Sequence, residues 1–319
     1  MIIAQAISFL LVSVFAVLFY CENASAQSLK VATIGITGPN LGLIPLETAI
    51  RKGYFKRQGL DVRVITVRQS DVIIKATMAG ELHFMDIVPT AILASVRGLP
   101  IRTIGITVKQ APYVLIGQPQ IKSVADLKGK KIGVSSLGGM STYLVRDLVS
   151  QAGLNPDRDV TFLSVGGTSS RTAALASGTI DSALVVAPDN FALERKGYKR
   201  LVWSPDVIDY PFSGVATSAD LLARERDFAV AFLKALVAGT QEVKQNRNES
   251  IGIMKSYLRI GDEEAEKSYE FLVKDMPANL VPDDAVIRSA INFAAKSLRL
   301  QPDAVPDISK VRDWSFAPR

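Results

Sequence analysis

Residues 131–153, KIGVSSLGGMSTYLVRDLVSQAG, predict a buried strand, a glycine-rich loop and a helix. Gly138 and Gly139 allow the loop backbone to turn tightly and to approach a ligand closely. Ser141 or Thr142 is a suitable N-cap for the helix. Because a helix N-terminus presents unpaired N–H groups, the stretch suits an anionic or polar group. Many strand–loop–helix connections only turn the chain, so the function depends on the rest of the sequence.

The same pattern occurs twice in the chain. Residues 61–67 (DVRVITV) resemble residues 159–165 (DVTFLSV), and residues 76–82 (ATMAGEL) resemble residues 174–180 (ALASGTI) at the same offset. Strands alternate with helices throughout both blocks, which is typical of an α/β fold with a largely parallel sheet. We therefore expect two lobes of similar build. A strand at residues 212–217 then precedes a mostly helical C-terminal part.

The N-terminus predicts export. Residues 2–20 are almost wholly apolar, and Ala24-Ser25-Ala26 is a small-x-small cleavage site. We expect a signal peptide over residues 1–26 and a periplasmic location. No Lys or Arg precedes the apolar run, which is also long enough for an uncleaved membrane anchor. Cleavage would remove Cys21, the single cysteine, and leave no disulfide in the mature chain.

Composition excludes several function classes. The chain has 319 residues, of which 48% are hydrophobic and 21% charged, enough for a sizeable core. Lys and Arg number 37 against 31 Asp and Glu, but they form no basic run, so we expect no nucleic-acid partner. Gly139 stands where a phosphate-binding loop needs lysine, so we expect no ATP hydrolysis and no cofactor. With His83 as the single histidine, we expect neither a metal site nor catalytic residues.

The candidate ligand site lies where parallel strands end. Ligands of doubly wound sheets bind beyond the carboxyl ends of the strands. The loops there offer hydroxyls, amides, one arginine and two aspartates between apolar walls, which suits a small anion or a zwitterion. Arg68 would neutralise an oxyanion that residues 139–142 cap. We expect the ligand-binding residues to be Thr37, Asn40, Leu41, Arg68, Gln69, Ser70, Asp86, Pro112, Gly139, Met140, Ser141, Thr142, Thr168 and Asp189.

Four segments carry a family resemblance, at residues 42–64, 80–100, 123–133 and 171–181. They include KGYFKRQGLDV and ADLKGKKIGV. With these segments the chain resembles the type II periplasmic solute-binding proteins of ABC importers, in the group that serves nitrate, alkanesulfonates, taurine and thiamine-pyrimidine precursors. The resemblance covers nearly the whole mature chain.

The resemblance implies a fold and its division. We expect two α/β lobes with mixed, mostly parallel sheets flanked by helices, joined by two crossover strands near Gly117 and Tyr210. Lobe I would comprise residues 27–117 and 211–319, and lobe II residues 118–210. The last helices would pack on lobe I. Arg171 and Asp181 match the family pattern, and we interpret them as framework positions.

The resemblance also implies a function. We expect a non-enzymatic, monomeric binding protein that captures a small solute by hinge closure and delivers it to an ABC permease with a separate ATPase subunit. An anion such as a sulfonate, nitrate or a carboxylate is favoured, and an aminopyrimidine stays open. The alternatives are a periplasmic sensor subunit and an enzyme related to thiamine-pyrimidine synthesis.

Overall fold

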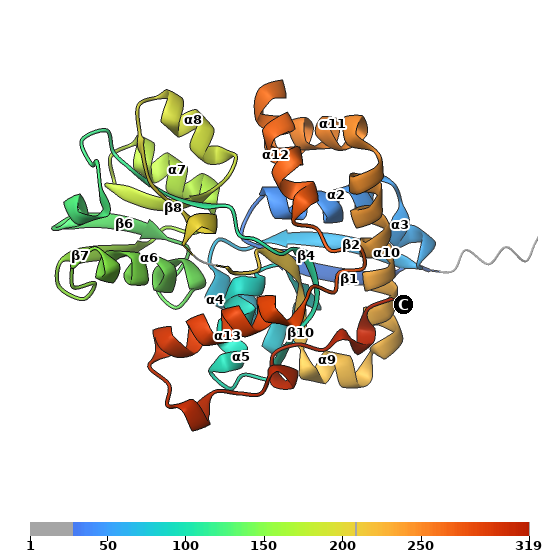
Figure 1. The fold of residues 1–319 in the computed structure, drawn as a ribbon. Coiled ribbons are helices and arrows are strands. Elements are labelled where there is room, and N and C mark those ends of the chain that lie inside the picture. Colours follow the sequence, from blue (N-terminus) through green and yellow to red (C-terminus); the bar gives the residue numbers. More distant parts are fainter. Residues whose placement is uncertain (1–27, 208, 319) are drawn as a thin grey trace, which may run out of the picture.

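The computed structural model describes residues 28–207 and 209–318. The expected signal peptide, with Cys21, lies outside the described residues. Within them, no helix combines the length and the apolar character needed to cross a membrane. The chain forms two lobes side by side, each with a five-stranded sheet flanked by helices (Figure 1).

The sheet of lobe I has the order β2-β1-β3-β10-β4. β1 pairs in parallel with β2 and β3, whereas β10 is antiparallel to β3 and β4. The bounds are β1 (Lys30–Ile36), β2 (Leu60–Thr66), β3 (Phe84–Met85), β4 (Ile101–Val108) and β10 (Ser213–Ser218).

The sheet of lobe II repeats this plan in the order β7-β6-β8-β5-β9. β6 pairs in parallel with β7 and β8, and β5 is antiparallel to β8 and β9. The bounds are β5 (Tyr113–Gly117), β6 (Lys130–Val134), β7 (Val160–Ser164), β8 (Ser182–Val186) and β9 (Lys199–Trp203). The resembling segments at residues 61–67 and 159–165 thus fall on equivalent edge strands, β2 and β7.

The first crossover lies earlier than the sequence predicted. β5 hydrogen-bonds along its whole length to β8, so residues from Tyr113 onward already belong to lobe II. The chain therefore leaves lobe I between Val108 and Tyr113, before Gly117. The returning segment before β10 lies beside this crossover, where Ala111 N donates to Tyr210 O at 3.0 Å.

Helices cover both sheets, and the C-terminal ones lie on lobe I (Figure 1). Lobe I carries the short helix η1 (Leu41–Leu43), α2 (Ile44–Arg51), α3 (Tyr54–Arg57), α4 (Ser70–Met78), α5 (Val88–Val96), α9 (Ala219–Arg224), α10 (Arg226–Gln245), α11 (Arg247–Leu258), α12 (Asp262–Lys274) and α13 (Asp284–Leu298). Lobe II carries α6 (Met140–Gln151), α7 (Thr168–Ala176) and α8 (Asp189–Arg195). α9 and α10 are separated at Glu225, whose backbone leaves the helical region at φ −131°.

An aromatic cluster joins α10 to the sheet of lobe I. Phe232 is fully buried and stacks on Phe84 from β3, with ring centroids 4.2 Å apart. Phe55 from α3 packs on the other side of Phe232 at 4.9 Å. Such pairs contribute about 0.5–1.5 kcal/mol beyond the area that they bury.

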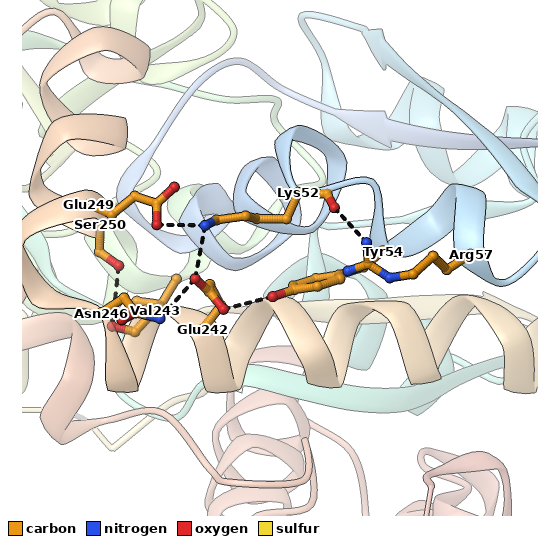
Figure 2. Close-up of polar contacts among 8 residues, drawn as sticks. All are labelled: Lys52, Tyr54, Arg57, Glu242, Val243, Asn246, Glu249 and Ser250. Carbon is orange, nitrogen blue, oxygen red and sulfur yellow. Dashed lines mark hydrogen bonds and ion pairs between the residues drawn. The ribbon is translucent and has the colours of Figure 1, made fainter.

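A polar network fixes the same helices at the surface (Figure 2). Lys52 Nζ lies 3.1 Å from Glu242 Oε1 on α10 and 2.6 Å from Glu249 Oε2 on α11. Tyr54 Oη donates to Glu242 Oε2 at 2.6 Å, and this bond is the largest factor that lowers the pKa of Glu242. The network ties the first helices of lobe I to helices that follow almost two hundred residues later.

Candidate functional site

The glycine-rich loop lies between β6 and α6, as the sequence predicted. The helix begins at Met140 with the extended Gly139 as its N-cap, two residues before Ser141 and three before Thr142, the predicted caps. The hydroxyls of Ser141 and Thr142 fasten the loop instead. Ser141 Oγ accepts from Ser135 N at 2.9 Å, and Thr142 Oγ1 donates to Ser136 O at 2.7 Å.

This loop forms one wall of a cavity between the lobes, which we call the polar cavity. The volume open to the centres of water-sized spheres is about 70 Å³. One water needs ~10–15 Å³ on this measure, so the cavity has room for ~5–7 waters or one small solute. Its lining includes the predicted residues Thr37, Asn40, Ser70, Asp86, Met140, Ser141 and Thr168. It also includes residues outside the expected ligand-binding set, namely Gly38, Ile87, Pro89, Thr90, Tyr113, Ser135, Arg171, Val186, Phe212 and Ser213.

Four helices begin at the polar cavity. Ser70 is the first residue of α4, Thr90 lies in the first turn of α5, Met140 opens α6 and Thr168 opens α7. Two of these helices come from each lobe. A helix N-terminus carries a partial positive charge and unpaired N–H groups. Their convergence favours a negatively charged occupant.

Arg171 adds a full positive charge. It lies on α7, is 4% exposed and lines the polar cavity. Its Nη2 donates to Thr168 Oγ1 at 3.1 Å, whereas Nε and Nη1 have no hydrogen-bond partner among the described residues. Burial lowers the pKa of Arg171 to about 10, with Tyr113 and Asp189 acting in the opposite direction. The guanidinium is therefore charged at neutral pH, with two buried nitrogens unsatisfied.

Asp86 supplies an acidic group to the same cavity. It follows β3 and is held by Gly214 N, which donates to Oδ1 at 2.9 Å, and by Ser213 Oγ, 2.8 Å from Oδ2. Burial raises the pKa of Asp86 to about 7, against these hydrogen bonds. Burial also raises the pKa of Tyr113 to about 12, so its hydroxyl is protonated at neutral pH. Arg171 is thus the one side chain of the lining with an unambiguous charge at neutral pH.

The other predicted residues do not line the polar cavity. Arg68 is exposed, and the arginine that lines the polar cavity is Arg171 of lobe II, which we interpreted from the sequence as a framework position. Gln69 is also exposed, and its Nε2 donates to Ser164 Oγ of lobe II at 3.2 Å. Burial raises the pKa of Asp189 to about 6, and Arg171 opposes this rise. The residues outside the lining are Leu41, Arg68, Gln69, Pro112, Gly139, Thr142 and Asp189.

The two lobes are closed on one another around the cavity. Ser70 Oγ of lobe I lies 3.1 Å from Ser136 Oγ of lobe II. Met140 N donates to Thr90 Oγ1 at 3.3 Å. Both contacts lie near the N-termini of helices that face one another across the cavity. Farther out, the Lys296 ammonium pairs with the Asp147 carboxylate at 2.8 Å. The cavity is therefore enclosed by both lobes.

The lining of the polar cavity contains no histidine. His83 lies in a different groove, where its Nδ1 accepts from Thr33 N at 3.1 Å. In residues 28–207 and 209–318, no cluster of His, Cys, Asp or Glu side chains is suited to a metal ion. Its side chains offer charge and hydroxyl groups for binding.

Comparison with known families agrees with this geometry. The profile of the family described as NMT1/THI5 like matches residues 40–250, which include both crossovers and all of lobe II. The chain belongs to the NMT1/THI5-like family. The fold with two mixed sheets flanked by helices is that of its structural neighbours, the periplasmic binding proteins.

Two of the similar proteins are named for the small molecules that they bind, and a third is named as an enzyme. The riboflavin-binding protein RibY of Chloroflexus aurantiacus is 24% identical over 234 residues, which cover 70% of this chain and 66% of RibY. The match thus spans slightly less than two thirds of that relative. The alkanesulfonate-binding protein SsuA of Xanthomonas axonopodis pv. citri, bound to MOPS, superposes with a TM-score of 0.71 at 18% identity and covers 89% of this chain and 98% of SsuA. The desulfurization enzyme DSZB superposes with a TM-score of 0.61 at 16% identity, over 90% and 97% of the two chains. At these identities the two structures show the fold alone.

Proposed function

We propose that this protein is an exported, non-enzymatic binding protein of an ABC-type importer. It captures a small anionic solute between its lobes and presents the closed form to a membrane permease that works with a separate ATPase subunit. The names of RibY and SsuA support a binding role, and the expected signal peptide supports a periplasmic location. The protein acts as a monomer in this proposal.

The observation that carries the proposal is the buried, unsatisfied Arg171 among four helix N-termini. Leaving a buried charge without a partner destabilises a folded chain by several kcal/mol. Such a group is retained where a ligand supplies the missing partner. An oxyanion in the polar cavity would accept hydrogen bonds from Arg171 and from hydroxyls of both lobes, such as Ser141 and Ser70. Because the anion contacts both lobes, its binding favours the closed form.

The size of the polar cavity narrows the solute. Room for ~5–7 waters at ~30 Å³ of liquid volume each corresponds to ~150–210 Å³. Nitrate, a short sulfonate or a small carboxylate fits this space. Riboflavin, with three fused rings and a ribityl chain, is too large for the closed cavity. We therefore favour a small anion over riboflavin, the ligand stated in the name of RibY, as the solute of this protein.

An enzyme is a weaker candidate, although DSZB has the same fold. The polar cavity offers one guanidinium, one aspartate and several hydroxyls, and His83 lies in another groove. The Asp86 carboxylate lies 2.8 Å from the Ser213 hydroxyl, but the lining of the polar cavity holds no histidine or cysteine for nucleophilic catalysis. A sensor subunit would use the same capture step and differ in its membrane partner. A pull-down with solubilised membranes, in the presence and absence of ligand, separates permease from receptor.

A thermal-shift screen tests the proposed ligand class. The panel pairs nitrate, methanesulfonate, taurine, acetate and benzoate with neutral amides of similar shape, and includes an aminopyrimidine. A ligand at 100 times its dissociation constant adds ~2.7 kcal/mol of stability, which raises the unfolding midpoint by several degrees. We expect at least one anion, and none of the neutral amides, to produce this shift. Stabilisation by an uncharged compound alone would contradict the anion site.

A further inference from the structure

A second pocket lies between the lobes, and it shares no lining residue with the polar cavity. Its volume, open to the centres of water-sized spheres, is about 220 Å³. Lobe I contributes residues of η1 and α12, and lobe II contributes residues of α8 and β9. The lining residues are Leu41, Ala187, Asn190, Phe191, Arg200, Trp203, Lys267, Ser268 and Phe271. We call this space the aromatic pocket.

Three aromatic rings form most of its walls. Trp203 of lobe II and Phe271 of lobe I meet edge to face, with ring centroids 5.8 Å apart and an interplanar angle of 72°. Phe191 lines the same space from α8. All three side chains are only partly buried, so their faces are available to a further ring. Aromatic rings prefer such offset or edge-to-face partners.

The charged groups of the aromatic pocket are already neutralised. Arg200 Nη2 lies 2.7 Å from Glu194 Oε2, and Lys267 Nζ lies 2.7 Å from Glu263 Oε1. Arg200 and Lys267 are thus both paired with carboxylates, so neither favours an anionic ligand in this pocket. The chemistry of this pocket therefore differs from that of the polar cavity, where Arg171 lacks a partner.

Two buried polar atoms of the aromatic pocket lack partners. Asn190 is 1% exposed; its Nδ2 donates to Glu194 Oε1 at 2.7 Å, whereas its Oδ1 has no hydrogen-bond partner among the described residues. Ser268 is 3% exposed, and its Oγ is likewise unsatisfied there. Buried polar groups are nearly always hydrogen-bonded, so each exception needs an explanation. The amide oxygen of Asn190 requires a donor.

We propose that the aromatic pocket binds a small aromatic molecule that carries a hydroxyl or amino group. The ring lies against Trp203, Phe271 and Phe191, and the donor group bonds to Asn190 Oδ1. Because the walls come from both lobes, the occupant also favours the closed form. The inference rests on this pocket alone and does not depend on the nature of the solute in the polar cavity.

Phenol is the probe that tests this site. The chain contains two tryptophans, Trp203 and Trp314, so a Trp314→Phe background leaves Trp203 as the single fluorescent reporter. Titration with phenol, excited where phenol absorbs little, should give a saturable change of Trp203 emission. Toluene, which has a similar ring and no donor, should bind about 5–10-fold more weakly, since it leaves Asn190 Oδ1 unpaired.

Variants of the walls separate specific binding from general partition into apolar surface. Asn190→Ala and Phe271→Ala should each weaken phenol binding by about 5–10-fold, the range of one lost hydrogen bond or ring contact. Phe162→Ala on β7, which removes a partly buried ring from a different groove, is the matched control and should bind phenol like the background. Circular dichroism of each variant verifies the fold.

Three results would overturn the proposal. Trp203 emission that does not respond to phenol at tens of millimolar would show that the pocket takes no such ring. Equal affinity for toluene and phenol would remove the role of Asn190. Folded Asn190→Ala and Phe271→Ala variants that bind phenol as tightly as the background would show that phenol binds elsewhere.

Discussion

Replacing Gly167 with alanine should prevent full closure of the lobes without disturbing either lobe. Gly167 of lobe II lies against the backbone of Thr37 in lobe I. A Cβ atom at this position would stand 2.2 Å from Thr37 O and 3.1 Å from Thr37 C. Its backbone angles, φ −61° and ψ 171°, are extended and acceptable to alanine. The conflict therefore exists only between the lobes.

The structure gives the size of the effect. Ordinary contact begins at 3.4 Å, so the two backbones must separate by about 1.2 Å, the difference between 3.4 and 2.2 Å. Overpacking of this kind destabilises a packed interface by ~1–3 kcal/mol. The open form carries no such strain. We expect Gly167→Ala to weaken binding of the solute by about 5–150-fold, since 1.4 kcal/mol corresponds to tenfold.

Isothermal titration calorimetry measures the affinity, and small-angle X-ray scattering measures closure. Gly138→Ala is the matched control, because a Cβ atom there would meet only Arg97 Nη1, at 3.8 Å. With saturating ligand, wild type and Gly138→Ala should both become more compact, and Gly167→Ala should contract less. Wild-type affinity and full contraction of Gly167→Ala would refute the role of this contact in closure.

Two further predictions concern groups already described. Asp86→Asn should remove a pH dependence of stability. The pKa of Asp86 is about 7 in the folded protein, above its ordinary value of 3.8, so the folded state of the wild type loses stability as pH rises from about 4 to 7. The loss amounts to up to about 4 kcal/mol. Urea unfolding across this range should show a flatter dependence of stability on pH for Asp86→Asn. Tyr54→Phe should lower the free energy of unfolding by about 1 kcal/mol, because it deletes the 2.6 Å hydrogen bond to Glu242 and keeps the ring. An unchanged urea midpoint would show that Lys52 and Asn246 hold Glu242 without the tyrosine hydroxyl.

The architecture could be predicted from the sequence because alternating strands and helices, and segments that resemble one another, indicate how a chain folds. Strand alternation and the resembling segments predicted two lobes of one plan, and the two sheets have the same strand order. The position of the first crossover was wrong because β5 follows β4 after a short link, and only pairing with β8 assigns it to lobe II. Strand pairing between distant segments leaves no local signal in the sequence.

The candidate site was predicted in part for a similar reason. Loops at strand ends were expected to meet, and Thr37, Ser70, Asp86 and Ser141 from these loops line one cavity. The arginine that reaches it lies on α7, and its position in a helical segment concealed its role. Arg68 stands in the expected loop, but its side chain is exposed. One feature of the sequence could have indicated that Arg171 lines the cavity. Arg171 follows Thr168 by three residues, in the first turn of a helix that begins at a predicted site loop.

The role of Arg171 is the central claim, and titration of one variant tests it most directly. Arg171→Met keeps the length and much of the packing of the side chain but removes the charge. The affinity of the anion identified by thermal shift should fall by ~10–150-fold, since a hydrogen bond to a charged group contributes ~1.5–3 kcal/mol. The variant should stay folded, because the guanidinium makes only one hydrogen bond among the described residues, to Thr168. A folded Arg171→Met protein that binds the anion as tightly as wild type would contradict the anion site.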